Sequence, residues 1–141
     1  MNKTMTTALA TALALASCAD PMAVAESEGV RVELKWSVLT IENASNAGIY
    51  HFAIDRALVA RIEWSGCGFS RVMDPEQECG PGIRRGERRE IPTRTIAGWG
   101  DSHEIVVYWW HLVPAPEEEG FQRDSIRALV LRLPYARQRS E

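Results

Sequence analysis

The segment from His103 to Leu112 constrains the fold more than any other part of the chain. It reads HEIVVYWWHL, and most of its residues are β-branched or aromatic, the types that favour strands. Alternate residues of a strand share a face, which places on one side Ile105, Val107 and Trp109 and on the other Val106, Tyr108, Trp110 and Leu112. A strand that is apolar on both faces must be covered on both, so we predict a central strand here. Glu104, near its start, is expected to tolerate substitution.

The chain from Val30 onward has the pattern of short strands separated by turns. Apolar and polar residues alternate from Val30 to Val38, and the phase then shifts, which indicates either a β-bulge or a break into two strands. Further strands are expected over residues 49–55, 58–64, 87–91 and 125–133. Pro92 favours an edge position for the strand that it ends. We therefore predict an all-β domain over residues 30–134, an antiparallel β-sandwich of about seven strands.

One stretch of this domain has a resemblance to a known fold. Leu39-Thr40-Ile41-Glu42-Asn43-Ala44-Ser45, running into Ile49-Tyr50, resembles the second and third strands of immunoglobulin-like domains in bacterial surface proteins. The likeness is one of strand, Asn-Ser turn and strand, and it implies an immunoglobulin-like sandwich. The Cys–Trp–Cys arrangement of antibody domains is missing, because Cys67 and Cys79 lie within one loop region. A small barrel is the alternative architecture.

The N-terminal residues have the layout of a secretory signal. Lys3 precedes an apolar run from Ala8 to Ala16, which is too short to span a bilayer and ends in small residues before a cysteine. Leu15-Ala16-Ser17-Cys18 resembles the lipobox of bacterial lipoproteins at all four positions. The resemblance implies a signal peptide over residues 1–17 and a diacylglyceryl group on the sulfur of Cys18. Cleavage before Cys18 and acylation of the new amine by a fatty acid such as palmitate would follow.

The lipobox resemblance also implies a location. The protein is expected to be lipid-anchored at the cell membrane or outer membrane, with its domain facing the periplasm or cell exterior. Residues 18–29 would then be the acylated cysteine and a flexible tether, because they are small, acidic and without hydrophobic period. Residues 135–141 would form a C-terminal tail. The alternative is an ordinary cleaved signal in which the cysteine is accidental.

The two cysteines outside the signal suit a disulfide. Cys67 and Cys79 form an even pair in a compartment that favours oxidation, so we expect them to be bonded to each other. Free thiols are the alternative. A zinc site would need two further ligands at suitable spacing, and the neighbouring sequence offers none.

Composition and motifs argue against several classes of function. The formal net charge of −3 disfavours nucleic-acid binding, which needs a strong basic face. His103 and His111 share a strand face but lie roughly 26 Å apart, too far to hold one metal ion. No Gly-x-Ser-x-Gly motif and no distinct pair of catalytic carboxylates is found, so we expect neither enzyme activity nor a cofactor.

Arginines gather between the second cysteine and the central strand: Arg84, Arg85, Arg88, Arg89 and Arg94. They could meet anionic lipid headgroups or an acidic partner. A solvated strand edge that discourages pairing with other strands is the more ordinary interpretation.

Aromatic residues suggest a binding surface. Trp99 lies in a glycine-flanked turn, and Tyr108 and His111 lie on the outer face or at the end of the central strand. We expect a non-enzymatic binding role towards another envelope macromolecule, a protein or a carbohydrate, at the loop end that carries the cysteine pair and Trp99. The alternatives are a protease-inhibitor-like module with a disulfide-braced loop and a carbohydrate or small-ligand binder that uses Trp99 and Tyr108. Trp99 could instead be a plug that closes the end of the sandwich.

Overall fold

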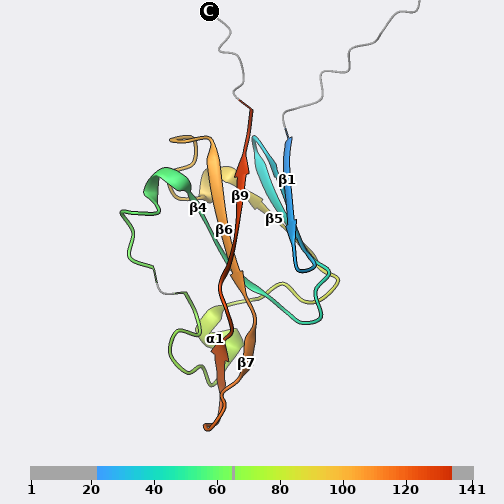
Figure 1. Ribbon diagram of the computed structural model, residues 1–141, viewed down its shortest axis with the longest axis vertical. Coiled ribbons are helices and arrows are strands. Elements are labelled where there is room, and N and C mark those ends of the chain that lie inside the picture. Colours follow the sequence, from blue (N-terminus) through green and yellow to red (C-terminus); the bar gives the residue numbers. More distant parts are fainter. Residues whose placement is uncertain (1–21, 65, 135–141) are drawn as a thin grey trace, which may run out of the picture.

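Two antiparallel sheets pack against each other in the computed structural model, which describes residues 22–64 and 66–134 (Figure 1). The first sheet contains, in spatial order, β1 (Met22–Ser27), β2 (Val30–Lys35), β3 (Val38–Asn43) and β5 (Arg88–Pro92). The second contains β4 (Tyr50–Asp55), β6 (Glu104–Trp110) and β9 (Arg127–Arg132). A separate hairpin is made by β7 (Leu112–Pro114) and β8 (Phe121–Arg123). The predicted all-β sandwich is confirmed: within the described residues its two sheets contain seven strands, and the separate hairpin adds two more.

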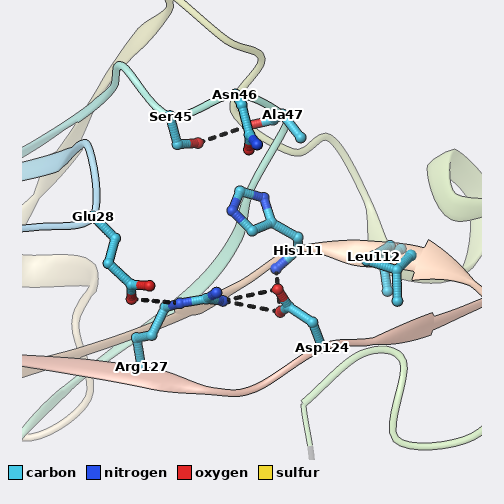
Figure 2. Close-up of a pocket in the computed structure, with 9 residues that line it drawn as sticks. Glu28, Ser45, Asn46, Ala47, His111, Leu112, Asp124 and Arg127 are labelled. Carbon is cyan, nitrogen blue, oxygen red and sulfur yellow. Dashed lines mark hydrogen bonds and ion pairs between the residues drawn. The ribbon is translucent and has the colours of Figure 1, made fainter.

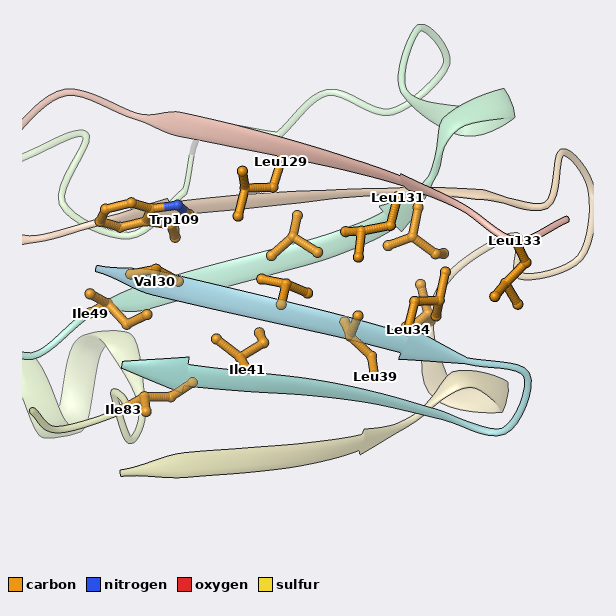
Figure 3. Packing of buried hydrophobic residues seen from close by; sticks show 14 residues of the cluster. Val30, Leu34, Leu39, Ile41, Ile49, Ile83, Trp109, Leu129, Leu131 and Leu133 are labelled. Carbon is orange, nitrogen blue, oxygen red and sulfur yellow. The ribbon is translucent and has the colours of Figure 1, made fainter. Parts of the chain in front are cut away.

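The central strand is β6, as its sequence indicates. It lies between β4 and β9, with Val107 paired to Ala53 on one side and to Leu129 on the other. Ile105, Val107 and Trp109 are fully buried between the sheets. Figure 3 shows Trp109, Leu129 and Leu131 of the second sheet facing aliphatic residues of the first. The edge position of β5 is confirmed as well.

The phase shift near Val38 marks a break into two strands. β2 and β3 form a hairpin that turns at Trp36–Ser37, and Leu34 pairs with Leu39 on its buried side. Because the chain reverses there, Trp36 leaves the buried face that the alternation assigned to it and stands half exposed.

Two segments differ from their expected structure. Residues 22–27, expected in the tether, form β1, because Ala23 and Ala25 are small enough to pack on the core while β1 pairs with β2. Cys18 and the signal peptide lie outside the described residues. Residues 58–64 are not a strand. Asp55 accepts a hydrogen bond from Ala57 N at 2.9 Å and starts a 3-10 turn, η1 (Arg56–Leu58), which ends β4.

A buried asparagine stabilises the turn that connects β3 of the first sheet to β4 of the second. Asn43, at the end of β3, donates from Nδ2 to the carbonyls of Ala47 at 2.8 Å and Ile83 at 2.9 Å. Its Oδ1 accepts from the backbone and hydroxyl of Ser45. The predicted Asn-Ser turn is therefore held by side-chain hydrogen bonds to the backbone. The immunoglobulin-like likeness of this segment stays a prediction.

The environment of Glu104 argues against the tolerance to substitution that we expected. Its side chain is buried at the start of β6, where it accepts a hydrogen bond from Arg132 Nε and lies 3.3 Å from Arg56 Nη1. A buried carboxylate needs such partners, so its environment rather than its place near a strand end decides the effect of substitution.

Candidate functional site

The three residues expected to form a binding surface lie in three different places. Trp99 packs near Trp36, whose ring lies 5.6 Å from that of His103, just before β6 begins. Tyr108 lies on the outer face of the second sheet, and His111 follows the other end of β6. The disulfide lines a pocket with Trp110, at the end of β6. Trp99 and the disulfide therefore do not share an end of the sandwich, which corrects the expected contact surface.

His111 lies in a polar cavity of about 540 Å³ (Figure 2). Its walls come from the β1–β2 turn, the Asn43 turn and the start of β7, together with the segment before β9. The lining residues are Glu28, Ser45, Asn46, Ala47, His111, Leu112, Val113, Asp124 and Arg127.

Arg127 organises the charges of this cavity. Its Nη1 lies 3.0 Å from both carboxylate oxygens of Asp124, and its Nε donates to Glu28 at 2.7 Å. The guanidinium also covers the ring of Trp109 at 4.6 Å. Burial by itself would lower the pKa of Arg127, but the bonds to Asp124 and Glu28 outweigh burial and raise that pKa.

The cavity contains serine, histidine and aspartate, but they are not arranged as a nucleophile and its base. His111 Nδ1 lies 2.9 Å from the carbonyl of Gly48, and Asp124 accepts from the backbone of His111 rather than from its ring. The hydroxyl of Ser45 is bonded to Asn43 Oδ1 and to the carbonyl of Ala47. A serine hydrolase needs the serine hydroxyl on the imidazole and a carboxylate on its far side. These contacts instead favour a structural network.

The disulfide loop and the β7–β8 hairpin form one braced unit, which we call the braced tip (residues 66–82 and 112–123). The predicted disulfide is confirmed, with the Cα atoms of Cys67 and Cys79 5.4 Å apart. Cys79 is the last residue of α1 (Pro75–Cys79), which is capped by Asp74, whose carboxylate accepts from Gln77 N at 3.2 Å.

Backbone hydrogen bonds join the two halves of the braced tip. Val72 and Phe121 exchange bonds of 2.8 and 2.7 Å, and Arg123 N donates to Gly68 O at 3.1 Å. The approach depends on Gly120, whose φ is +103° and where a Cβ atom would lie 2.7 Å from the carbonyl of Val72. The braced tip is therefore an ordered platform.

Three large apolar side chains stand exposed on the braced tip. The exposed fractions are 69% for Phe69, 54% for Met73 and 36% for Phe121. The guanidinium of Arg123 lies 5.0 Å from the centre of the Phe69 ring. The cysteine pair pointed to this loop, but none of the strands expected from the sequence covers β8, the second strand of the hairpin that completes the braced tip.

Tyr108 belongs to an aromatic cluster on the outer face of the second sheet. Trp64 stacks on Phe52 at 4.8 Å and on Tyr108 at 5.0 Å, and Trp110 lies 5.5 Å from it. The sequence analysis did not predict this role of Trp64, because it placed Trp64 at the end of a strand over residues 58–64. The chain after η1 is instead irregular and folds back over the sheet. The alternation gave no signal of that return.

Trp99 packs partly buried against the core, as the plug alternative requires. Trp36, 5.4 Å from it, offers the exposed ring at this end. Met22 pairs with Lys35 next to Trp36, so this is also the end at which β1 begins.

Comparisons with family models, with curated proteins and with solved structures found no match to this chain. Within residues 22–64 and 66–134, no group of three or more His, Cys, Asp or Glu side chains is placed to hold a metal ion. The same part of the chain has no helix of sufficient length and hydropathy to cross a membrane.

Proposed function

We propose that the protein is a lipid-anchored, non-enzymatic binding module of the cell envelope that engages a partner protein through the braced tip. The observation that carries this proposal is the exposure of Phe69, Met73 and Phe121 on one disulfide-braced platform. Aromatic and methionine side chains are enriched at protein interfaces. A platform that is already ordered loses little conformational entropy when it binds.

The direction of the braced tip supports the same proposal. Figure 1 places α1 and β7 at the end of the molecule opposite to the start of β1. The chain that follows a lipidated Cys18 would join the domain at Met22, the first residue of β1, at that opposite end. The braced tip would then point away from the membrane, towards other components of the envelope.

A carbohydrate-binding role at Trp36 is the second candidate. Its ring is half exposed and supported by Trp99, as in a shelf on which a sugar ring stacks. Its position beside Met22 places it near the proposed anchor, where a partner has less access.

The anchor has a direct test. Cys18→Ala removes the thiol that would be lipidated, so the variant is expected to keep its leader or to leave the membrane fraction. Mass spectrometry of the purified protein and detergent phase partitioning measure the two effects. Processing and membrane partition equal to those of the unaltered protein would show that Cys18 is not the anchor.

The partner surface is tested by photo-cross-linking in the source cells. A photoreactive residue is placed in the full-length protein at Phe69, at Trp36 or at Lys35, the last being an exposed control on β2. We expect one specific protein adduct from position 69 and none from position 35. Met73→Ser should reduce that adduct about tenfold, because it removes one of the three large apolar side chains exposed on the braced tip. The thermal melt should not change, since this side chain is exposed.

Two results of this experiment would contradict the proposal. Equal adducts at positions 69 and 35 would mean that the braced tip makes no specific contact. A carbohydrate adduct at position 36 together with none at 69 would favour the second candidate.

A further inference from the structure

A second pocket opens beside the disulfide, between β4 and the side chain of Arg89 on β5. It has a volume of about 400 Å³, and we call it the Arg89 pocket. Its walls include four aromatic rings and two basic side chains: Tyr50, Phe52, Trp64, Trp110, His51 and Arg89. Of these positions, the sequence analysis had considered only Arg89 for contact with an anion, as one of five neighbouring arginines.

Arg89 brings a positive charge to the wall of this pocket. Its Nη1 and Nη2 each donate at 2.8 Å, to the carbonyls of Pro81 and Gly82. Neither carbonyl carries a charge, and no carboxylate of the described residues lies within 4.0 Å of this guanidinium. Arg88, its neighbour in sequence, lies 3.0 Å from Glu90 and 3.8 Å from Glu42. Two hydrogen bonds therefore orient Arg89 and leave N–H groups for an anion.

Two further nitrogens of the wall have no partner. Trp110 is almost fully buried, and its Nε1 makes no hydrogen bond with the described residues; the same is true of His51 Nδ1. An indole N–H can only donate, so it lacks an acceptor. Burial, and then the charge of Arg89, lower the pKa of His51 to about 4, which keeps its imidazole neutral at pH 7. Trp110 Nε1 is therefore a donor without an acceptor among the described residues, whereas His51 Nδ1 donates or accepts according to the tautomer.

The aromatic wall suits a flat apolar body. Phe52 and Trp64 are stacked with an interplanar angle of 13°, and Trp110 is tilted against Trp64 at 53°. The carboxylate of Glu76 raises the pKa of Tyr50 after the larger effect of burial, but Glu76 lines a neighbouring hollow and not the Arg89 pocket.

From the Arg89 guanidinium, the unmet Trp110 donor and the stacked rings, we propose that the Arg89 pocket binds a carboxylate attached to an aromatic ring. The carboxylate would lie on Arg89, and the ring would lie against the aromatic wall beside Trp64. A free aromatic acid and the C-terminus of a peptide that ends in phenylalanine both have this chemistry. The proposal is independent of the contact made by the braced tip.

The test is a titration of the full chain with phenylacetate, followed by NMR. The five tryptophans should give five indole N–H signals, and the signal that disappears in Trp110→Phe is that of Trp110. We expect a saturable shift of the Trp110 signal. Phenylacetamide, which lacks the charge, and acetate, which lacks the ring, should each bind at least about tenfold more weakly. A short peptide ending in a free phenylalanine carboxylate, compared with its C-terminal amide, distinguishes the second source from the first.

Variants at two adjacent arginines complete the test. Arg89→Gln should weaken phenylacetate binding about tenfold or more, whereas Arg88→Gln, on the same strand, should leave it unchanged. The dispersion of the spectrum shows whether each variant is folded. If Arg89→Gln does not fold, the comparison of phenylacetate with phenylacetamide on the unaltered chain still tests whether binding requires the carboxylate. Equal affinity for those two compounds, or no shift of the Trp110 signal, would overturn the proposal.

Discussion

Val107→Asp is expected to destabilise the protein by more than about 4 kcal/mol, a large part of the roughly 5–15 kcal/mol that stabilises a typical domain. Val107 has an exposed fraction of 0% and lies at the middle of β6, paired with Ala53 and Leu129. Its side chain is part of the core between the two sheets. A carboxylate there would be buried without a partner, and the cost of removing its charge from water has no compensation. Unfolding by urea, followed by tryptophan fluorescence, measures the loss.

The matched control is Val130→Asp. Val130 lies on the adjacent strand β9 with an exposed fraction of 48%, so the same substitution adds a charge that water can solvate. Its effect should stay within about 1 kcal/mol. A Val107→Asp protein that unfolds at the same urea concentration as Val130→Asp would mean that β6 is not the interior strand of the sandwich.

Acid is expected to destabilise the fold through His51 by about 3 kcal/mol. Burial, and then the charge of Arg89, lower the pKa of His51 in the folded protein to about 4, against an ordinary value of 6.5. The unfolded chain therefore takes up a proton at a pH where the folded chain does not. Stability due to neutral His51 is complete above about pH 6.5, falls as the pH is lowered, and stops falling near pH 4.

The measurement is the free energy of unfolding at pH 7 and at pH 4, for the unaltered protein and for His51→Gln. Other titrating groups contribute similarly to both proteins, so the difference between them isolates His51. We expect the unaltered protein to lose about 3 kcal/mol more than the variant over this range. Parallel pH profiles for the two proteins would show that the imidazole is not shielded in the folded state.

Local sequence patterns predicted β2, β3, β4, β5, β6 and β9, but they missed β1 and the β7–β8 hairpin and wrongly assigned residues 58–64 to a strand. The segment 103–112 is apolar on both faces, which required a central position in a sheet. Cys67 and Cys79 were the pair available for a disulfide once Cys18 was assigned to the lipid. Asn43 indicated its turn because its side chain bonds to the nearby backbone, which is a local interaction. Alternation with period 2 is a geometric property of an extended chain, so it assigned the two faces of β6 without knowledge of its partner strands.

The tertiary structure alone decided which surfaces are brought together. Trp99, Tyr108 and His111 were grouped by residue type, yet they lie at one end, on the outer face and at the other end of the second sheet. The pocket beside Arg89 combines strands of both sheets with the disulfide loop. Trp64 reaches it because the chain after η1 returns over the sheet. Such contacts join residues that are far apart in the sequence. A local sequence pattern contains no information about which distant segments pack together, so it could not predict these contacts.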